Sequence, residues 1–251
     1  MNDFSLNLAL NAGARDHDFA IDIALAPSAG ETHDLITGIL GRFSEACAQG
    51  FLSGSDNPLD AETLRFRYAD GRPDHIECEL SVKGVDYRAA RVLVGMLRGE
   101  AFLDGTILSV TVDDLGARDA HPMTITNERK IDLPGRYRET GAYPLTRAIG
   151  RAVSERLLRV RFIERPSAEM VQQLIHLQKV WMAVCQGGFA TNGREAHTCF
   201  VSAPEGYLIS PRVFEIAIDM FENPEAAFDP LLNALDRSSA RLLTVEEVQI
   251  Y

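Results

Sequence analysis

Three side chains that could bind a metal ion alternate along one short segment, at His75, Glu77 and Glu79. Successive side chains of a strand point to opposite faces, so these three would share one face. An imidazole and two carboxylates are a possible ligand set. Arg65 and Arg67 would face them across a hairpin, however, and cross-strand Arg–Glu pairs commonly stabilise sheets. We therefore expect ion pairs and no metal site, and keep all five as candidate binding residues.

A second pair of reactive side chains, His197 and Cys199, also alternates along one predicted strand. A nucleophilic cysteine needs a histidine within hydrogen-bond reach. Residues two apart on a strand are separated by about 6.6 Å, which is too far for a direct hydrogen bond. We therefore predict no catalytic role for this pair.

A glycine-rich stretch at 186–189 is followed by 191–194, where Arg194 could hold an anion. Phosphate-binding loops precede a helix N-terminus, where free N–H groups face the ligand. This stretch follows a predicted helix, so its glycines are better explained as a C-cap and a turn. Arg194 is kept as a candidate binding residue.

The catalytic and cofactor motifs that a sequence can reveal are missing. The chain contains no Walker A, Rossmann, GxSxG, HExxH or EF-hand pattern. Its four cysteines, Cys47, Cys78, Cys185 and Cys199, are widely spaced and form no CxxC pair. Zinc sites need clustered ligands, whereas isolated cysteines are usually small buried apolar residues. We predict no catalytic residue, no metal and no cofactor, and lean against an enzyme.

The charge of the chain is strongly acidic and unevenly spread. The net charge is −11, which disfavours nucleic-acid binding because phosphates require a cationic surface. Residues 128–165 nevertheless contain ten Lys and Arg, among them Arg136 and Arg138, against five acids. This basic segment could dock on an acidic surface of the same chain, dock on another subunit, or hold a phosphate-bearing ligand. Arg136 and Arg138 are therefore candidate binding residues.

The elements that would position these residues occur in the same order twice. Residues 19–113 and 157–250 each read strand, helix, strand, strand, helix, strand. In the first half we expect strands at 19–25, 63–68, 75–80 and 106–113, with a turn at 69–72, and helices at 32–49 and 87–98. In the second half we expect strands at 157–163, 197–202, 213–220 and 242–250, and helices at 167–186, with Ser167 as N-cap, and 225–236.

This order predicts an α+β fold, a tandem duplication of the ferredoxin-like βαββαβ unit. Each unit would form an antiparallel four-stranded sheet with both helices on one face. The other face would be open, and the simplest expectation is that the two open faces pack together. Residues 1–118 would form the first repeat, 119–156 an ordered connector and 157–251 the second repeat.

Two further segments add detail to this plan. Residues 4–10 alternate cleanly and would add an N-terminal edge strand that turns back onto the strand at 19–25. In the connector, 123–126 and 129–133 could form short strands, and 145–155 is predicted to be helical.

The sequence also leads to expectations about the cellular compartment and the general class of function. No apolar run approaches the roughly 18 residues of a membrane span, and residues 1–5 lack a secretory signal, so we expect a cytoplasmic protein without membrane contact. We favour a non-enzymatic binding or assembly module whose partner is a protein, either basic or a second copy, bound through sheet faces or the junction between repeats. The alternative is a small-molecule enzyme or sensor with an anion site between the repeats.

Overall fold

The computed structural model describes thirteen stretches of the chain. They are residues 5–10, 13–26, 30–53, 62–72, 74–85, 87–104, 107–115, 122–123, 143–147, 155–188, 202–220, 225–239 and 244–251.

Helices and strands alternate in mixed order along these stretches. The first half contains β1 (Ser5–Ala9), β2 (His17–Leu25), α1 (Gly30–Ala48), β3 (Glu62–Arg72), β4 (His75–Lys83), α2 (Ala89–Asp104), β5 (Ile107–Asp114) and β6 (Pro122–Met123). The second contains β7 (Leu145–Arg147), β8 (Glu155–Phe162), α3 (Ala168–Gly188), β9 (Tyr207–Ser210), β10 (Val213–Asp219), η3 (Glu225–Ala227), α4 (Phe228–Ser239) and β11 (Val245–Ile250).

The strands form two sheets, so the prediction of a mixed α+β architecture is confirmed. The first sheet has the order β3-β4-β2-β5-β1-β6 and the second β7-β11-β8-β10-β9. Strand β1, which lies between β5 and β6, runs parallel to β5, and the outer strand β7 runs parallel to β11. The remaining pairs are antiparallel.

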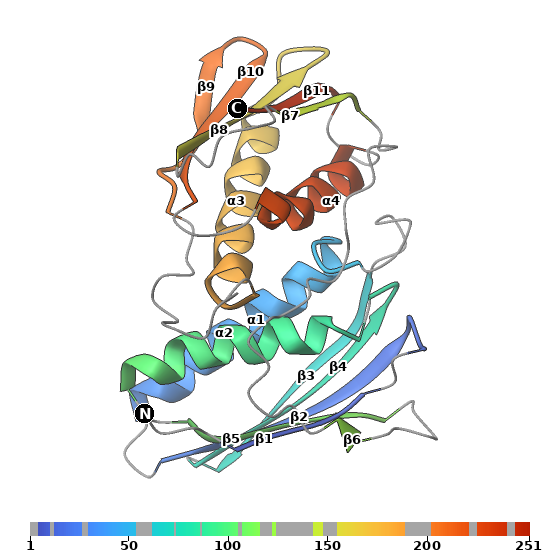
Figure 1. Ribbon diagram of the computed structural model, residues 1–251, viewed down its shortest axis with the longest axis vertical. Helices are drawn as coiled ribbons and strands as arrows, with labels where there is room; N and C mark the ends of the chain where they lie inside the picture. The colour runs from blue at the N-terminus through green and yellow to red at the C-terminus, as the bar shows by residue number, and fades with distance from the viewer. Residues whose placement is uncertain are drawn as a thin grey trace.

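The layers are stacked with the helices inside and the sheets outside (Figure 1). Helices α1 and α2 lie on the first sheet, α3 and α4 lie on the second, and α3 packs against both α1 and α2. The expectation that the two open sheet faces pack together is therefore wrong. It fails because the helices carry apolar residues toward each other as well as toward their sheets, so the helix layers provide the junction.

Side-chain alternation decides which face of each strand is buried. Strand β2 buries Phe19, Ile21, Ile23 and Leu25 against the helices, while the residues between them are more exposed. A strand whose inward residues are apolar and whose outward residues are polar fits a sheet that is covered on one side. Helix α1 ends at Ala48, and Gly50 in the turn that follows has a φ of 81°, the left-handed conformation that glycine adopts readily.

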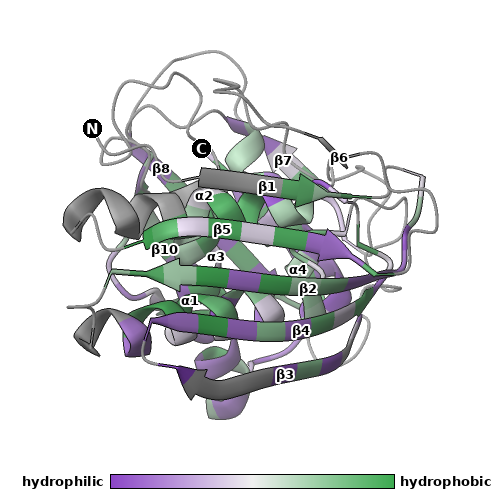
Figure 2. Ribbon diagram, turned by 90° about the horizontal axis from the view of Figure 1, so that it is seen from below, coloured by the Kyte–Doolittle hydropathy of each residue, from purple (hydrophilic) through white to green (hydrophobic). Residues whose placement is uncertain are grey.

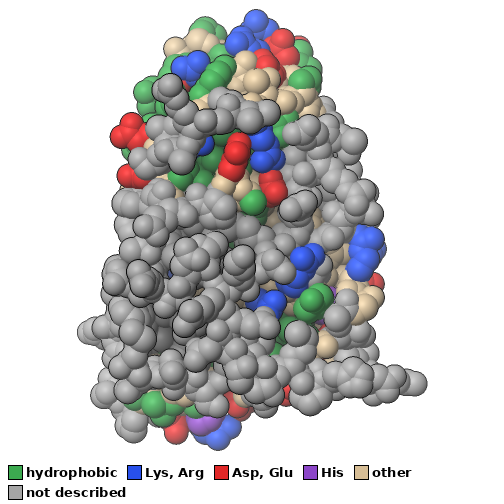
Figure 3. Space-filling model, in the orientation of Figure 1, with side chains coloured by type: hydrophobic (Ala, Val, Ile, Leu, Met, Phe, Trp, Pro, Cys, Tyr) green, Lys and Arg blue, Asp and Glu red, His purple; other side chains and the backbone are tan. Residues whose placement is uncertain are grey.

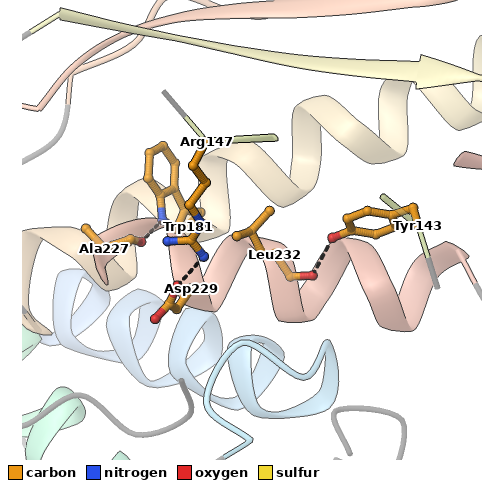
Figure 4. A network of polar contacts seen from close by, with 6 residues as sticks. All are labelled: Tyr143, Arg147, Trp181, Ala227, Asp229 and Leu232. Atoms are coloured by element: carbon orange, nitrogen blue, oxygen red, sulfur yellow. Dashed lines mark hydrogen bonds and ion pairs between the residues drawn. The ribbon is translucent and has the colours of Figure 1, made fainter. Parts of the chain in front are cut away.

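Buried and partly buried hydrogen bonds fix the position of α4 and η3 (Figure 4). Tyr143 Oη donates to the Leu232 carbonyl at 2.9 Å, and Arg147 binds Asp229 at 2.8 Å. Trp181 Nε1 donates to the Ala227 carbonyl at 2.7 Å. These bonds tie Tyr143 and β7 to α4 and tie α3 to η3, which positions the helix layer beneath the second sheet.

Some helix and strand ends agree with the predictions from the sequence, and others do not. Ser167 caps α3 as predicted, because its hydroxyl accepts the Met170 N–H at 3.2 Å. The predicted turn at 69–72 is wrong, because β3 continues to Arg72, which pairs with His75, and the extra residues form a bulge. Helix is wrong for the start of 145–155, where Leu145–Arg147 forms strand β7 beside β11.

Two predicted pairings also differ. Strand β1 lies beside β5 rather than beside β2 because β5 occupies the neighbouring position of β2. The hairpin partner of β10 is β9, and 197–201 lie outside the described residues, although Ser202 bridges Asp219. Gly206 lies just before β9, where a Cβ atom would come within 2.4 Å of the Phe214 ring. Of the connector, the predicted strand at 129–133 lies outside the described residues.

The three described cysteines, Cys47, Cys78 and Cys185, are buried, as expected, and Cys199 lies outside the described residues. Burial raises the pKa of all three thiols above the ordinary value of 9.0. Such thiols stay protonated and behave as apolar core residues. Among the described helices, none is long and apolar enough to cross a membrane.

Candidate functional site

The first sheet has an open face of its own, which we call the first outer face (Figure 2). It consists of the outward side chains of β2, β3, β4 and β5. On β2 and β5 the outward side chains, apart from the exposed Leu108 beside an irregularity in the pairing, are acidic or small: Asp18, Ala20, Asp22, Ala24, Ser109, Thr111 and Asp113. Asp18 and Asp22 are exposed and Asp113 is half-buried, and Asp22 lies directly opposite Glu77 of β4. Like charges on opposite positions repel, and the Arg72 guanidinium, 2.8 Å from Glu77, offsets part of this repulsion.

The predicted hairpin cluster lies at one side of this face. Arg65 binds Glu79 at 3.2 Å, and Glu77 binds Arg72 at 2.8 Å rather than Arg67. Both pairs are about half-exposed, so their contribution to stability is small. Arg67 lies opposite Glu79 in the register of the two strands. The structure therefore brings these hairpin residues onto one surface, and their binding role stays a prediction.

His75 does not join a ligand set with the two glutamates. Its Nδ1 lies 3.5 Å from an Asp74 carboxylate oxygen, and the side chain is about one third exposed. Among the described residues, no group of three or more His, Cys, Asp or Glu side chains could hold a metal ion. Arg136, Arg138, Arg194, His197 and Cys199 lie outside the described residues.

The outward side chains of the second sheet form the second outer face. One row of it crosses four strands through paired positions, in the order Tyr207, Glu215, Arg159 and Gln249. Arg159 Nε donates to Glu215 at 2.6 Å, and this hydrogen bond raises the pKa of Arg159. The Arg159 guanidinium carbon also lies 5.3 Å from the centroid of the Tyr251 ring. A guanidinium held between a carboxylate and an aromatic ring is fixed in orientation.

Apolar side chains are exposed around this row. Tyr207 is 58% exposed, Ile163 55%, Ile209 43% and Tyr251 41%. In Figure 3, apolar, basic and acidic side chains gather at the end of the molecule formed by the second sheet. Sequence reasoning missed Tyr207 and Ile209 because the hairpin strand was placed at 197–202. Their apolar character at exposed positions beside a turn was the available signal.

Part of the basic segment binds acids of its own chain. Arg147 reaches Asp229 on α4, Arg159 reaches Glu215, and Arg161 lies 3.7 Å from Glu247. Docking on acidic groups of the same chain thus accounts for these three arginines.

A buried polar pair lies at one end of the first sheet. His17 Nδ1 is 2.7 Å from Asp114 Oδ2, and both side chains are almost fully buried. The His17 ring stacks on Phe19 with 5.0 Å between centroids. Within the described part of the chain, His17 Nε2 is buried without a hydrogen-bond partner. Neither side chain reaches the solvent, so the pair has the character of a structural tie between β2 and β5.

No protein-family model matches this chain, and no curated protein matches it. Some solved structures resemble it weakly. A "putative glycine cleavage system transcriptional repressor" is 11% identical with a TM-score of 0.23, and the match covers 95% of this chain and 99% of that one. A protein from Galdieria sulphuraria, described as unknown, is 11% identical with a TM-score of 0.23, covering 92% and 98%. A "putative monooxygenase" from Fusobacterium nucleatum is 8% identical with a TM-score of 0.22, covering 94% of each. Likeness at this level carries no argument about fold or function.

Proposed function

We propose that this chain is a tandem duplication of a ferredoxin-like unit that acts as a non-enzymatic protein-binding module in the cytoplasm. Its partner is a basic protein, and the first outer face is the binding surface. The observation that carries the proposal is that the outward charges of β2 and β5, namely Asp18, Asp22 and Asp113, are all acidic on a face that the helices leave open. Complementary charge steers association and selects partners.

The geometry supports a face rather than a sheet edge as the contact. Edge strands invite pairing with other chains unless they are short, charged or bulged. Strand β3 is long but has register shifts at two places and carries Arg65 and Arg67. Strand β9 has only four residues. The other two edge strands, β6 and β7, have two and three described residues. All four edges are therefore poor templates for strand addition.

The alternative function, an enzyme or sensor with an anion site between the two halves, gains no support from the described residues. There α3 packs directly on α1 and α2, and the buried apolar residues of both halves form one continuous cluster. This alternative remains a prediction about Arg136 and Arg138.

The test is affinity capture with matched charge-reversed variants. The tagged wild type, the variant Asp22→Lys/Asp113→Lys and the control Glu164→Lys/Glu205→Lys would each be incubated with lysate of the source organism. Both variants change the net charge equally, but the control residues are exposed on the second half. We expect a basic protein that the wild type and the control retain and that Asp22→Lys/Asp113→Lys loses.

Affinity for that protein, once purified, should fall at least about tenfold for Asp22→Lys/Asp113→Lys because like charges would then face each other. Equal retention by all three baits, or equal loss by both variants, would exclude the first outer face as the binding surface.

A further inference from the structure

The second outer face has a feature that the first outer face lacks: its central row is self-complementary. The sheet order β11-β8-β10-β9 places Gln249, Arg159, Glu215 and Tyr207 side by side at one level. Arg159 and Glu215 lie at the centre of the row. Gln249 lies outside Arg159, and Tyr207 lies outside Glu215. Tyr251 belongs to the β11 side, because its hydroxyl donates to Gln249 at 2.6 Å.

From this row we propose that two copies of the chain pair face to face through their second outer faces. A two-fold axis that lies between β8 and β10, parallel to the strands, exchanges these two strands between copies. Arg159 of each copy then lies over Glu215 of the other. Tyr207 of each copy lies over Gln249 beside Tyr251 of the other. Such a two-fold contact requires one surface that complements itself.

The stacking geometry is one that sheets adopt readily. The axis leaves the strands of both copies nearly aligned, as in sandwiches in which sheets pack about 10 Å apart. Outward side chains of β8 and β10 include Leu157, which is half-buried, Val213, which is buried, and Ala217, which is exposed. Leu157 and Ala217, which pair with each other, would form the apolar lining between the charged row and one end of the sheet, whereas Val213 is already buried.

The composition of the face also fits a protein contact. Tyrosine and arginine are the residues most enriched at the energetic centres of interfaces. Here Arg159 is already ordered by Glu215 and Tyr251, so little further ordering is needed on association. Single exposed apolar residues are ordinary, but Tyr207 and Ile209 lie on β9, and Ile163 and Tyr251 directly follow β8 and β11 of the same sheet.

Charge selects a second copy over other occupants of this face. Two molecules with a net charge of −11 repel each other over most of their surfaces. At the centre of the second outer face, Arg159 and Arg161 balance Glu215 and Glu247, and each arginine lies beside an acid. A strongly basic or acidic partner would gain nothing there, whereas a second copy finds its charges matched.

The experiment is a charge exchange followed by sedimentation velocity of the full chain. We expect the wild type to sediment as a dimer. Arg159→Glu alone and Glu215→Arg alone should each sediment as monomers, because the contact would then oppose like charges. An equimolar mixture of these two variants should sediment as a dimer again, since each supplies the charge that the other lacks.

Controls separate this result from a loss of folding. Circular dichroism of both single variants should match the wild type, and Leu108→Ser, an exposed site at the first sheet, should leave the dimer intact. Tyr207→Ser, which keeps both charges, should weaken self-association at least about tenfold. A wild type that is monomeric at about 0.1 mM, where weak complexes are largely formed, would overturn the proposal. So would a mixture that stays monomeric although both variants are folded.

Discussion

The two outer faces belong to sheets with the same order of core strands, yet their surfaces differ in kind. On the first, β2 and β5 carry carboxylates separated by small side chains such as Ala20 and Thr111. On the second, Arg–Glu pairs lie between exposed tyrosines. The inward residues of both sheets are mainly apolar, with the buried pair His17 and Asp114 as an exception in the first. The difference teaches that one architecture can offer two contact chemistries, because only the outward positions are free to vary.

The largest expected effect on stability comes from replacing an inward residue of β10, compared with replacing its outward neighbour. Phe214 is fully buried, whereas its neighbour Glu215 faces outward. Phe214→Ala should lower the free energy of unfolding by about 3–5 kcal/mol through the cavity it leaves. Glu215→Ala should lower it far less but weaken self-association. Urea unfolding of both variants measures the loss of stability, and sedimentation velocity measures the loss of self-association. Equal losses of stability would contradict the assignment of the two faces.

An intermediate effect is expected from the same division on β5 of the first sheet. Asp114 points inward to His17, and Asp113 points outward. Asp114→Ala should cost about 1–3 kcal/mol because a buried donor of His17 loses its acceptor. Asp113→Ala should cost less.

The sole tryptophan, Trp181, gives this test a second readout. It is buried in the other half of the molecule, where it stacks on Phe228. If both halves unfold as one unit, the fluorescence midpoint in urea shifts for Asp114→Ala. A shift in circular dichroism without one in fluorescence would show that the halves unfold separately.

The smallest expected effect concerns Cys78, which lies on β4 between the outward Glu77 and Glu79. Burial and then the charge of Glu79 raise the pKa of this thiol from 9.0 to about 12. Above pH 9.0 the unfolded chain loses this proton while the folded chain keeps it until about pH 12. The thiol's contribution to stability is therefore complete below pH 9.0 and is lost as pH rises toward 12.

Thermal unfolding measured at several alkaline pH values tests this thiol. Cys78→Ala should decline in stability less steeply with pH than the wild type does. Alkylation of the native wild type should also be slow at Cys78. Identical pH slopes for the two proteins would contradict a buried, protonated thiol.

Local signals predicted much of the secondary structure. The alternation of β2 and the cap at Ser167 follow from period and hydrogen bonding within a few residues, and both are confirmed. The Asp-Gly dipeptide at 70–71 misplaced a turn because its conformation suits a bulge as well. The positions of β1 and β7 could not be predicted, because each pairs with a strand about one hundred residues away in sequence.

The candidate surfaces show the same limit. Pairing of Arg65 with Glu79 could be expected from the hairpin, since both residues are close in sequence. The row of the second outer face could not, because it joins β11, β8, β10 and β9, whose register is set by long-range packing. The sequence also could not predict that the helix layers lie between the two sheets, because α3 is apolar on more than one side.

The helices between the two sheets have a consequence for valency. They hold the two outer faces at opposite ends of the molecule (Figure 1). A dimer formed through the second outer faces would therefore present two first outer faces that point away from each other. Such a dimer cannot bind one small partner through both first outer faces, but it can bridge two copies of a partner or two sites on a long partner. Binding to an immobilised, repetitive partner would then show avidity that binding to the free partner lacks.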